Sequence, residues 1–373
     1  MRSADTHAGA EQPEPRSRVA LRRERLRSHR LTAPAATVLE AAQHMLAVQS
    51  QDFTAGRWAL AVRTRGRVTL SAVDRAFDDG DLVRAWTMRG TLHTIPARDL
   101  TWLLSITGAR QSAPQGASRD RALGIDDEVL AAALRVIRPV LLDGGCTRAE
   151  AFARWTAAGI DPREQRGVHL LGALAMRGEI CQGPVAEATS SGIRREQRFV
   201  LVDRWIREHA RPSDPLAEFF VRYVEGHGPA GASDFAWWSG LPLGTAREAA
   251  ARAAPRLAEI DEGLFVGAIR PRRSPAAPSV VALGAFDEYY ISYADRTDVC
   301  SPEHLAAVGP GKNGMVRAVV VAEGRVVGVW RMPSTPGARR AGVPVAELFP
   351  PVTVASDEVS AAMRRYADFL ERG

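Results

Sequence analysis

Two glutamines, Gln49 and Gln51, lie two residues apart, with Ser50 between them and Asp52 directly after them. A glutamine carbonyl can accept a hydrogen bond from a water molecule and orient it, and its dipole can face a developing positive charge. It cannot act as a strong base near neutral pH. The pair therefore suits a hydrolysis that needs an oriented water and a stabilised cation. Because glutamine is mostly exposed, the pair taken alone also fits a polar helix terminus at the surface.

A second set of candidate residues is basic and indicates contacts with nucleic acid. It consists of Arg89, His93, Arg270, Arg272, Arg273 and Arg296. The first two lie in TMRGTLH (87–93), and the next three share the proline-rich segment 269–279. Arginine suits bidentate contacts with phosphate and guanine, so we expect this set to face DNA. Two alternatives stay open: the segment 269–279 as a solvated connector, and a structural hydrogen bond for His93.

The segment 284–296, GAFDEYYISYADR, brings acidic and aromatic residues together. Three of the five tyrosines fall within residues 289–293. A packed strand or helix face is the favoured role for them, and stacking on a base is the alternative. We expect Asp287 and Arg296 to form an internal ion pair that shapes a cleft, with catalysis by Asp287 as the minor alternative.

The composition is that of a folded protein with a modest positive charge. Of 373 residues, 46% are hydrophobic and 25% are charged, and the 49 basic and 43 acidic residues give a net charge of +6. This charge fits a polyanionic partner without requiring one. Lys312 is the only lysine, and the dominance of arginine is typical of a GC-rich genome. The length predicts two or three domains.

The sequence excludes several other classes of protein. Cys146, Cys181 and Cys300 are far apart, and no Cys or His spacing is typical of zinc, so we expect neither a disulfide framework nor a metal or other cofactor. No apolar run approaches the roughly 18 residues of a membrane span. Residues 1–18 are polar and lack the apolar core of a signal peptide. We therefore expect a disordered tail followed by a cytoplasmic, nucleoid-associated protein.

The elements that position the glutamine pair are predicted to be helices. The first covers residues 19–30, and Thr32 and Pro34 mark a break after it. The second covers residues 37–51 and carries an apolar stripe on one face. The glutamine pair is thus expected at the carboxyl end of this second helix.

A pattern of a short helix, a longer helix and a strand-like segment then occurs three times. The predicted units are 70–80 with 82–96, 147–160 with 163–183 and 198–203, and 232–242 with 243–260 and 263–269. Each short helix carries aromatic residues expected to be buried: Phe77, Phe152, Trp155, Phe235 and Trp238. This order is typical of a helix-turn-helix followed by a wing, so we favour tandem winged helices over three unrelated helical hairpins. Of Trp237 and Trp238, at least one is expected in the core.

The remaining chain is richer in strands. The segment 280–296 begins with β-branched residues. The segment 315–332 is predicted to be a hairpin, because two β-branched runs meet around Glu323 and Gly324. Residues 357–373 are predicted to form an amphipathic C-terminal helix.

Four stretches together resemble the AlkZ-like (YcaQ-like) DNA glycosylases. They are AVQSQD (47–52), AWTMRGTLHTIPARDL (85–100), GAFDEYYISYADR (284–296) and GMVRAVVVAEGRVVGVWR (314–331). The similarity spans nearly the whole chain after the tail. It implies an α+β fold of three tandem winged helix-turn-helix domains in a C-shaped arrangement, with a β-rich C-terminal segment. The implied parts are a tail (1–18), the N-terminal helices with the catalytic motif and first winged helix (19–135), the second winged helix (136–212), and the third with the β-rich segment and C-terminal helix (213–373).

The resemblance also implies an activity and a site. The family's catalytic motif is Gln-x-Gln or Gln-x-Asp, and here it falls on Gln49 and Gln51, the Gln-x-Gln form. Its middle position is often small or aliphatic, so Ser50 is a mild departure. The Gln-x-Gln branch implies a glycosylase that removes bulky, cationic N7-alkylguanines from double-stranded DNA, with interstrand crosslinks as further substrates, in self-resistance to a DNA-alkylating antibiotic.

Two further expectations follow. A glycosylase that also cleaves the strand needs an amine for a Schiff base. The only lysine, Lys312, lies in a predicted loop, so we expect monofunctional chemistry. We also expect the protein to act as a monomer. The alternative function is a winged-helix transcriptional regulator without enzymatic activity. A regulator is usually a dimer that reads a palindrome, whereas this chain already carries three modules.

Overall fold

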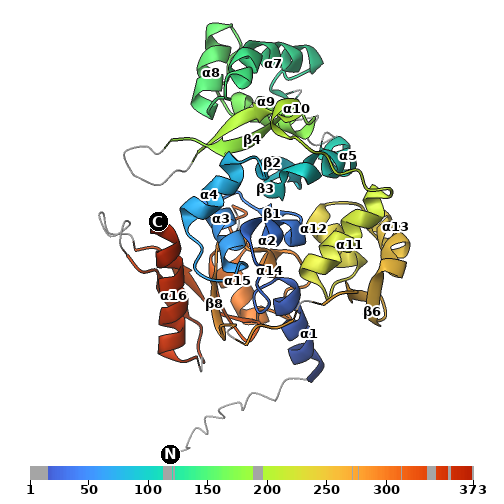
Figure 1. Ribbon diagram of the computed structural model, residues 1–373, viewed down its shortest axis with the longest axis vertical. Helices are drawn as coiled ribbons and strands as arrows, with labels where there is room; N and C mark the ends of the chain where they lie inside the picture. The colour runs from blue at the N-terminus through green and yellow to red at the C-terminus, as the bar shows by residue number, and fades with distance from the viewer. Residues whose placement is uncertain are drawn as a thin grey trace, which may run out of the picture.

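The computed structural model describes residues 16–111, 120, 122–187, 196–270, 272–275, 277–311, 313–333, 342–351 and 354–371. Within them the chain forms three units with one order of elements: three helices, a short strand or isolated bridge after the first helix, and a two-stranded hairpin. This is the order of a winged helix. Figure 1 shows the second unit as a lobe that projects from a broader body formed by the other two units and the C-terminal segment. Residues 1–15 and Lys312 lie outside the described residues.

The first winged helix contains the glutamine pair. Its elements are α2 (Val38–Met45), β1 (Val48–Gln49), α3 (Phe53–Val62), α4 (Leu70–Asp78), β2 (Leu82–Met88) and β3 (Thr91–Pro96). Side-chain oxygens of Thr37, Asp52 and Thr69 accept backbone N–H groups at the starts of the three helices, which explains why each begins where it does. Arg89 and Gly90, both at positive φ, form the two-residue turn between β2 and β3.

Two of the expected elements in this unit are wrong. The helix expected over 37–51 ends at Met45, because Leu46 adopts a φ of 61° and the buried chain after it enters the sheet as β1. The segment 82–96 is entirely a hairpin, so the helix-turn-helix of this unit is α3 and α4, one helix earlier than expected. Gln49 therefore lies on a strand that pairs with β3, not at a helix terminus.

The second winged helix follows the connecting elements η1 (Ala97–Asp99) and α5 (Leu100–Gln111). Its elements are α7 (Asp127–Leu142), α8 (Arg148–Ala157), α9 (Arg166–Met176), β4 (Ile180–Val185) and β5 (Gln197–Leu201), with an isolated bridge between Cys146 and Phe199 after α7. Thr147 and Glu150 form a capping box at the start of α8. The domain boundary expected after residue 135 falls inside α7, whose N-cap is Asp126, so a boundary ahead of that cap fits the elements better.

The third winged helix begins after α10 (Val202–Trp205), close to the boundary expected after residue 212. Its elements are α11 (Pro215–His227), α12 (Ala232–Ser239), α13 (Leu243–Ala253), η2 (Ala254–Arg256), β6 (Leu257–Asp261) and β7 (Leu264–Gly267), and a bridge joins Ala230 to Phe265. Asp214 caps α11, and Pro215 occupies its first turn. Trp238 is fully buried, as expected for one of the two neighbouring tryptophans, whereas Trp237 is 45% exposed.

The C-terminal segment forms an antiparallel sheet in the order β11-β10-β9-β8, flanked by a helix. Its elements are β8 (Val280–Leu283), α14 (Glu288–Ile291), η3 (Pro302–His304), α15 (Leu305–Val308), β9 (Val319–Ala322), β10 (Arg325–Arg331), β11 (Val345–Leu348) and α16 (Ser356–Leu370). The expected hairpin around Glu323 and Gly324 is confirmed, with both residues at positive φ. The α+β class, the three winged helices, the β-rich segment and the terminal helix are likewise confirmed.

The third helix of a winged helix usually enters a DNA groove. In the first and second units this third helix, α4 or α9, packs against a neighbouring unit. In the first unit, the Asp78 side chain of α4 accepts the backbone N–H of Val185 in β4 at 2.8 Å. In the second, α9 packs on β2 and α5: Gly172 lies against the Trp86 ring, and a Cβ at Gly108 would come within 2.8 Å of the Met176 carbonyl oxygen. These two helices hold the units together.

The helix α1 (Arg16–Ser28) and α3 pack against the C-terminal segment through buried polar bonds. The Arg63 guanidinium at the end of α3 forms a two-pronged ion pair with Asp287, with N–O distances of 2.7 and 2.8 Å. Neither side chain is more than 1% exposed. The expected ion pair between Asp287 and Arg296 is therefore wrong, because Asp287 pairs with Arg63.

Replacing Arg63 with Met should destabilise the protein by about 3–5 kcal/mol, because the substitution leaves the Asp287 carboxylate buried without its cation. Urea unfolding at neutral pH measures this change. The matched control is Arg67→Met, which breaks an ion pair to Glu371 between side chains that are 61% and 66% exposed; its cost should stay below about 1 kcal/mol. Equal losses in the two variants would contradict the interpretation.

Candidate active site

The glutamine pair lies where β1 meets the start of α3. Gln49 is on β1, pairs with His93 of β3, and is 9% exposed. Gln51 follows the strand and is exposed. Asp52 is exposed and caps α3 by accepting the Ala55 N–H at 2.9 Å, so one of its carboxylate oxygens has a structural role.

Ser50 lies between the two glutamines and is fully buried. Its hydroxyl hydrogen bonds to Thr94 Oγ1 at 2.7 Å and donates to the Val48 carbonyl at 3.1 Å. A Cβ at Gly56 would come within 2.1 Å of Ser50 Oγ, so α3 approaches the motif closely only because residue 56 is glycine. The buried middle residue directs Gln49 and Gln51 away from the core, since alternate residues of an extended chain face opposite sides.

Gln49 is held at both its backbone and its side chain. Its backbone N–H donates to Glu288 Oε1 at 2.6 Å. Its side-chain Oε1 accepts from Arg89 Nη2 at 2.9 Å, and Arg89 Nη1 donates to the Trp238 carbonyl at 2.7 Å. Because a guanidinium has only donors, the amide oxygen of Gln49 must face Arg89. The turn between β2 and β3 thus lies against α12 and fixes the amide orientation.

Gln51 is held mainly through its backbone. Arg84 Nε donates to the Ser50 carbonyl at 2.8 Å, and Nη2 donates to the Gln51 carbonyl at 3.4 Å. The same guanidinium donates to Gln182 of β4 at 2.7 Å, which ties the motif to the second winged helix. Burial lowers the pKa of Arg84 to about 10, so it remains a cation at neutral pH. The Gln51 side chain makes one long bond, from the Leu92 N–H at 3.4 Å, and is otherwise available to solvent.

Glu288 is a fully buried carboxylate directly behind the motif. Besides the Gln49 N–H, it accepts hydrogen bonds from Trp238 Nε1 at 2.9 Å and Ser292 Oγ at 2.5 Å, and His227 Nε2 lies 3.7 Å from Oε2. Burial by itself would raise the pKa of this carboxyl, but the interaction with His227 and the charge of Arg89 bring it down to about 2. The group is therefore a permanent anion at physiological pH.

A chain of buried polar groups extends from Glu288 toward α1. The Tyr223 hydroxyl donates to the Ser292 carbonyl at 2.9 Å, and the Tyr293 hydroxyl donates to the His227 carbonyl at 2.6 Å. Tyr293 also hydrogen bonds to His29 Nε2 at 2.8 Å. Burial holds the pKa of His29 well below its usual range, so this imidazole is neutral. The motif is thus supported by side chains from α1, α11, α12 and the segment that begins α14.

The structure moves two of the expected DNA contacts into the interior of the site. His93 is fully buried, and its Nδ1 lies 3.1 Å from Thr87 Oγ1 and 3.2 Å from the Thr91 carbonyl. Burial and the charge of Arg89 lower the pKa of His93 to about 3, so the ring is neutral and its role is structural. The half-buried Arg89 guanidinium donates to Gln49 and Trp238, and its expected contact with DNA stays a prediction.

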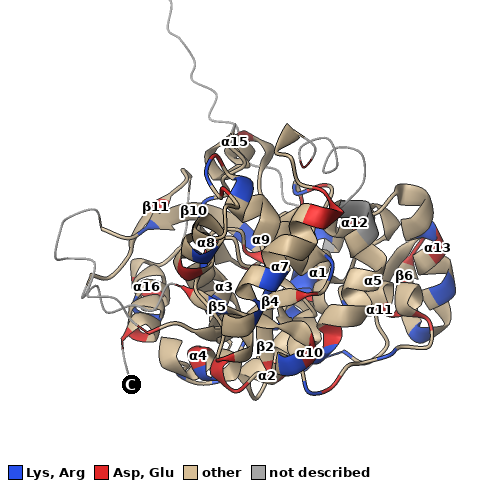
Figure 2. Cartoon of the chain, turned by 90° about the horizontal axis from the view of Figure 1, so that it is seen from above, with Lys and Arg blue, Asp and Glu red and all other residues tan. Residues whose placement is uncertain are grey.

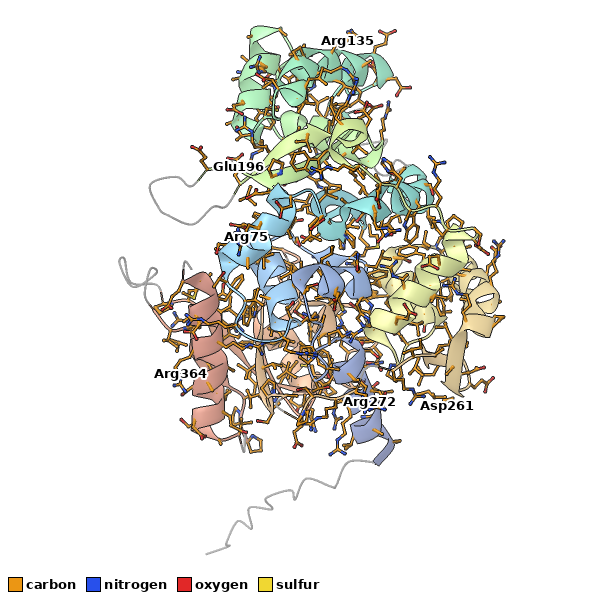
Figure 3. The ribbon with its side chains drawn as sticks, in the orientation of Figure 1. Arg75, Arg135, Glu196, Asp261, Arg272 and Arg364 are labelled. Carbon is orange, nitrogen blue, oxygen red and sulfur yellow. The ribbon has the colours of Figure 1, made fainter. Side chains whose placement is uncertain are left out.

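The other expected basic residues lie closer to solvent. Arg270, Arg272 and Arg273 are exposed, and Arg270 lies 4.0 Å from Glu24 of α1. Figure 3 labels Arg272 at the edge of the molecule near α1. Arg296 is half-buried over the rings of Trp237 and Tyr290. Figure 2 shows basic and acidic residues interspersed along the visible helices, so the net charge is not gathered in one stripe on that face.

The tyrosine cluster is packed, as favoured from the sequence. Tyr289, Tyr290 and Tyr293 are at most 1% exposed, and their hydroxyls donate to the carbonyls of Gly324, Gly309 and His227 at 2.7, 2.7 and 2.6 Å. Burial raises the pKa of Tyr290 to about 12. Stacking of these rings on a base is therefore ruled out in this arrangement.

Sequence reasoning missed Glu288 and Arg84. Glu288 lies next to Asp287 in GAFDEYYISYADR. The sequence does not distinguish these two acidic residues, because their different partners are set by the fold. Arg84 lies in the segment 82–96, and nothing in the sequence indicates that its side chain faces the glutamine pair. The pairing of β2 with β3 and β4 places it there.

The described residues show neither a metal site nor a membrane span. They contain no group of three or more His, Cys, Asp or Glu able to hold a metal ion. None of the described helices is long and apolar enough to cross a membrane. Two cavities lie beside Trp58 and Arg365, between α3 and α16, and neither is lined by the glutamine pair.

Comparison with known proteins gives three consistent findings. A family model described as "DNA glycosylase AlkZ-like" matches residues 42–369. The interstrand DNA cross-link repair glycosylase of Streptomyces sahachiroi is 27% identical over an alignment that covers 76% of this chain and 79% of that protein. The structure of Streptomyces sahachiroi DNA glycosylase AlkZ has the same fold, with a TM-score of 0.72 at 23% identity over 96% of this chain and 97% of the other.

Glu288→Gln removes the buried charge and keeps the shape, and it should lower the free energy of unfolding most at neutral pH. The folded pKa of about 2 lies below the value of about 4.3 for an unfolded glutamate, so the charge stabilises fully above that value. The loss in the variant should shrink as the pH falls from about 4 toward 2. Urea unfolding across this range measures it, with the exposed Glu371→Gln as control. A loss that does not change with pH would contradict the ionised state of Glu288.

Proposed function

This chain belongs to the AlkZ-like family of DNA glycosylases, hydrolases that cut N-glycosyl bonds in DNA repair, and we propose that its substrate is a cationic N7-alkylguanine in duplex DNA. In this reaction the bond between C1′ and the base breaks, and its electron pair goes to the base. Water adds to C1′ and releases a proton to solvent. Alkylation at N7 gives the base a positive charge, which departure neutralises, so the barrier is lower before the enzyme acts.

One observation carries this proposal: the motif presents two neutral amides, and the Glu288 carboxylate behind it is buried with donors on both oxygens. Asp52, which follows the motif, uses one carboxylate oxygen to cap α3. The proposed reaction uses no carboxylate as a base. A site with this chemistry can orient water and stabilise a sugar cation, but it gives little help to a neutral base, which needs protonation to leave.

The two glutamines have different environments, and we assign them different parts of the reaction. The Gln51 side chain is exposed, and its carbonyl carries only one long hydrogen bond, so it can orient the attacking water and face the sugar cation. The Gln49 carbonyl is turned toward the Arg89 cation, which leaves its NH₂ group as the free end. Gln49 then donates a hydrogen bond to the lesioned nucleotide. On this division of roles we propose that the chain belongs to the Gln-x-Gln branch of the family.

Bulky adducts and interstrand crosslinks fit an exposed motif. A base tied to the opposite strand cannot be turned into a closed pocket. Here the Gln51 side chain lies at the surface. The name of the Streptomyces sahachiroi relative refers to crosslink repair. We therefore propose bulky N7 adducts as the preferred substrates, with self-resistance to a DNA-alkylating natural product as the biological setting.

The regulator alternative is disfavoured by packing as well as by family. A winged-helix regulator reads bases with its third helix, yet α4 and α9 are used to join neighbouring units. The exposed Arg270, Arg272 and Arg273 stay proposed contacts with the DNA backbone, and the protein is proposed to act as a monomer. Such phosphate contacts would hold DNA of any sequence.

Gln51→Ala and Gln49→Ala should each lower the rate of base release about 10²–10³-fold, because each removes a polar group aimed at the reacting nucleotide. The assay counts abasic sites in a duplex with one N7-alkylguanine, corrected for spontaneous loss. Gln43→Ala is the matched control, since its side chain lies outside the motif on the same segment and only its backbone carbonyl is used, by Arg222. Efficient release of uracil, a neutral base, would contradict the proposed selectivity.

We also predict that borohydride added during turnover traps no covalent protein–DNA adduct, because the proposed reaction passes through water and not through a Schiff base. Lys312, the only lysine, lies outside the described residues, and Lys312→Ala should leave base release unchanged. Gel electrophoresis of the quenched reaction checks this, with a bifunctional glycosylase as the positive control. A trapped adduct that disappears in Lys312→Ala would overturn the monofunctional assignment.

A further inference from the structure

We propose that Trp237 and Arg296 form a binding site for a neutral planar aromatic group beside the lesioned nucleotide. This inference rests on the proposed function and adds a second contact region to the glutamine pair. Trp237 is 45% exposed, although an indole is a large apolar surface that folding usually buries more fully. Its neighbour Trp238 is fully buried and fills the core of the third winged helix. The Trp237 ring is therefore not needed to fill that core.

The Trp237 ring is fixed in place despite its exposure. Its Nε1 donates to the Ile291 carbonyl at the end of α14 at 2.9 Å. The guanidinium carbon of Arg296 lies 5.2 Å from the ring centroid, and 5.5 Å from the centroid of Tyr290, whose hydroxyl is tied to the Gly309 carbonyl. A held aromatic ring loses little conformational freedom when a ligand stacks on it, which favours binding.

The same residues that hold Gln49 also hold Trp237. Arg89 donates to the Gln49 side chain, and its other nitrogen lies 2.7 Å from the Trp238 carbonyl and 3.5 Å from that of Trp237. The Trp237 indole is tied to α14, the helix whose first residue, Glu288, accepts the Gln49 N–H. Trp237 is thus connected to Gln49 by two routes, one through Arg89 and its own backbone carbonyl and one through α14 and its indole, and we propose that a substituted nucleotide spans both residues.

Charge decides what the site can accept. Among the described residues no ion pair of Arg296 is found, and its guanidinium lies over the Trp237 and Tyr290 rings. A cationic alkylguanine over this pair would meet a like charge, whereas a neutral ring can stack on the indole while a phosphate pairs with Arg296. Two sources have this chemistry: an aromatic substituent carried by the adduct, and the neutral base next to the lesion.

The test compares three duplexes and two variants. The duplexes carry N7-methylguanine, N7-benzylguanine, or N7-methylguanine beside an abasic nucleotide. Each also exists with a 2′-fluoro sugar that resists cleavage, so that binding is measured apart from turnover. The variants are Trp237→Ala and Trp237→Phe, and the control is Leu243→Ala, which removes another exposed apolar side chain of the same winged helix, 41% exposed.

If the adduct supplies the ring, the wild-type protein should bind the benzyl duplex more tightly than the methyl duplex, and Trp237→Ala should reduce that preference about tenfold. If the neighbouring base supplies it, the methyl duplex should lose affinity when that base is removed, and Trp237→Ala should abolish the difference. Trp237→Phe should keep most of either preference, and Leu243→Ala all of it. Arg296→Met should weaken binding of all three duplexes and flatten the salt dependence.

The inference is overturned if Trp237→Ala changes binding of the three duplexes by the same factor, or not at all. Failure of the proposed function gives a different result: the wild-type protein binds the 2′-fluoro duplexes but releases no base from their cleavable counterparts. The preference for an aromatic ring is then still judged from binding alone. The proposed function and the aromatic binding site are therefore tested by separate results.

Discussion

The hydrogen bond from the Gln49 N–H to the buried carboxylate of Glu288 is the interaction on which the site depends. It joins a strand of the first winged helix to the segment after β8, and the same carboxylate accepts a bond from Trp238 in the third. One residue earlier, Asp287 pairs with Arg63 at the end of α3. Two adjacent acidic residues thus connect units far apart in the sequence. Because a buried charge is costly without its partners, the fold is held to the one arrangement that supplies them.

This framework is consistent with the proposed catalytic role of two neutral amides. The charged groups around Gln49 and Gln51 are used to set backbone and side-chain direction: Arg84 through two carbonyls, Arg89 through the Gln49 amide, and Glu288 through the peptide N–H. None of them has to change its protonation state. Orientation that is fixed in advance costs nothing during the reaction, which is the condition under which weak polar groups contribute most.

The sequence was sufficient to predict elements whose signals are local. The alternation around Glu323 and Gly324 predicted a hairpin, and the repeated aromatic helices predicted winged helices, because turn chemistry and amphipathic period depend on neighbouring residues. The helix over 37–51 was wrong since nothing local marks Leu46 as a terminus; tertiary pairing with β3 decides it. The partners of Asp287, Glu288, Arg84 and Arg89 were missed or misassigned for the same reason. Apart from partners within four residues, such as Ser292 for Glu288, each lies at least 33 residues away in the chain.

The five-stranded sheet has a consequence for mechanics. Its order, β1-β3-β2-β4-β5, runs from the strand with Gln49 into the projecting lobe of Figure 1, and the seam between β2 and β4 is paired at Arg84 and Gln182. The Arg84 guanidinium, which bridges this seam, also donates hydrogen bonds to the carbonyls of Ser50 and Gln51. A tilt of the lobe therefore pulls on the peptide groups that aim Gln51. The seam between β2 and β4 is therefore a mechanical link between the second winged helix and the peptide groups of Ser50 and Gln51.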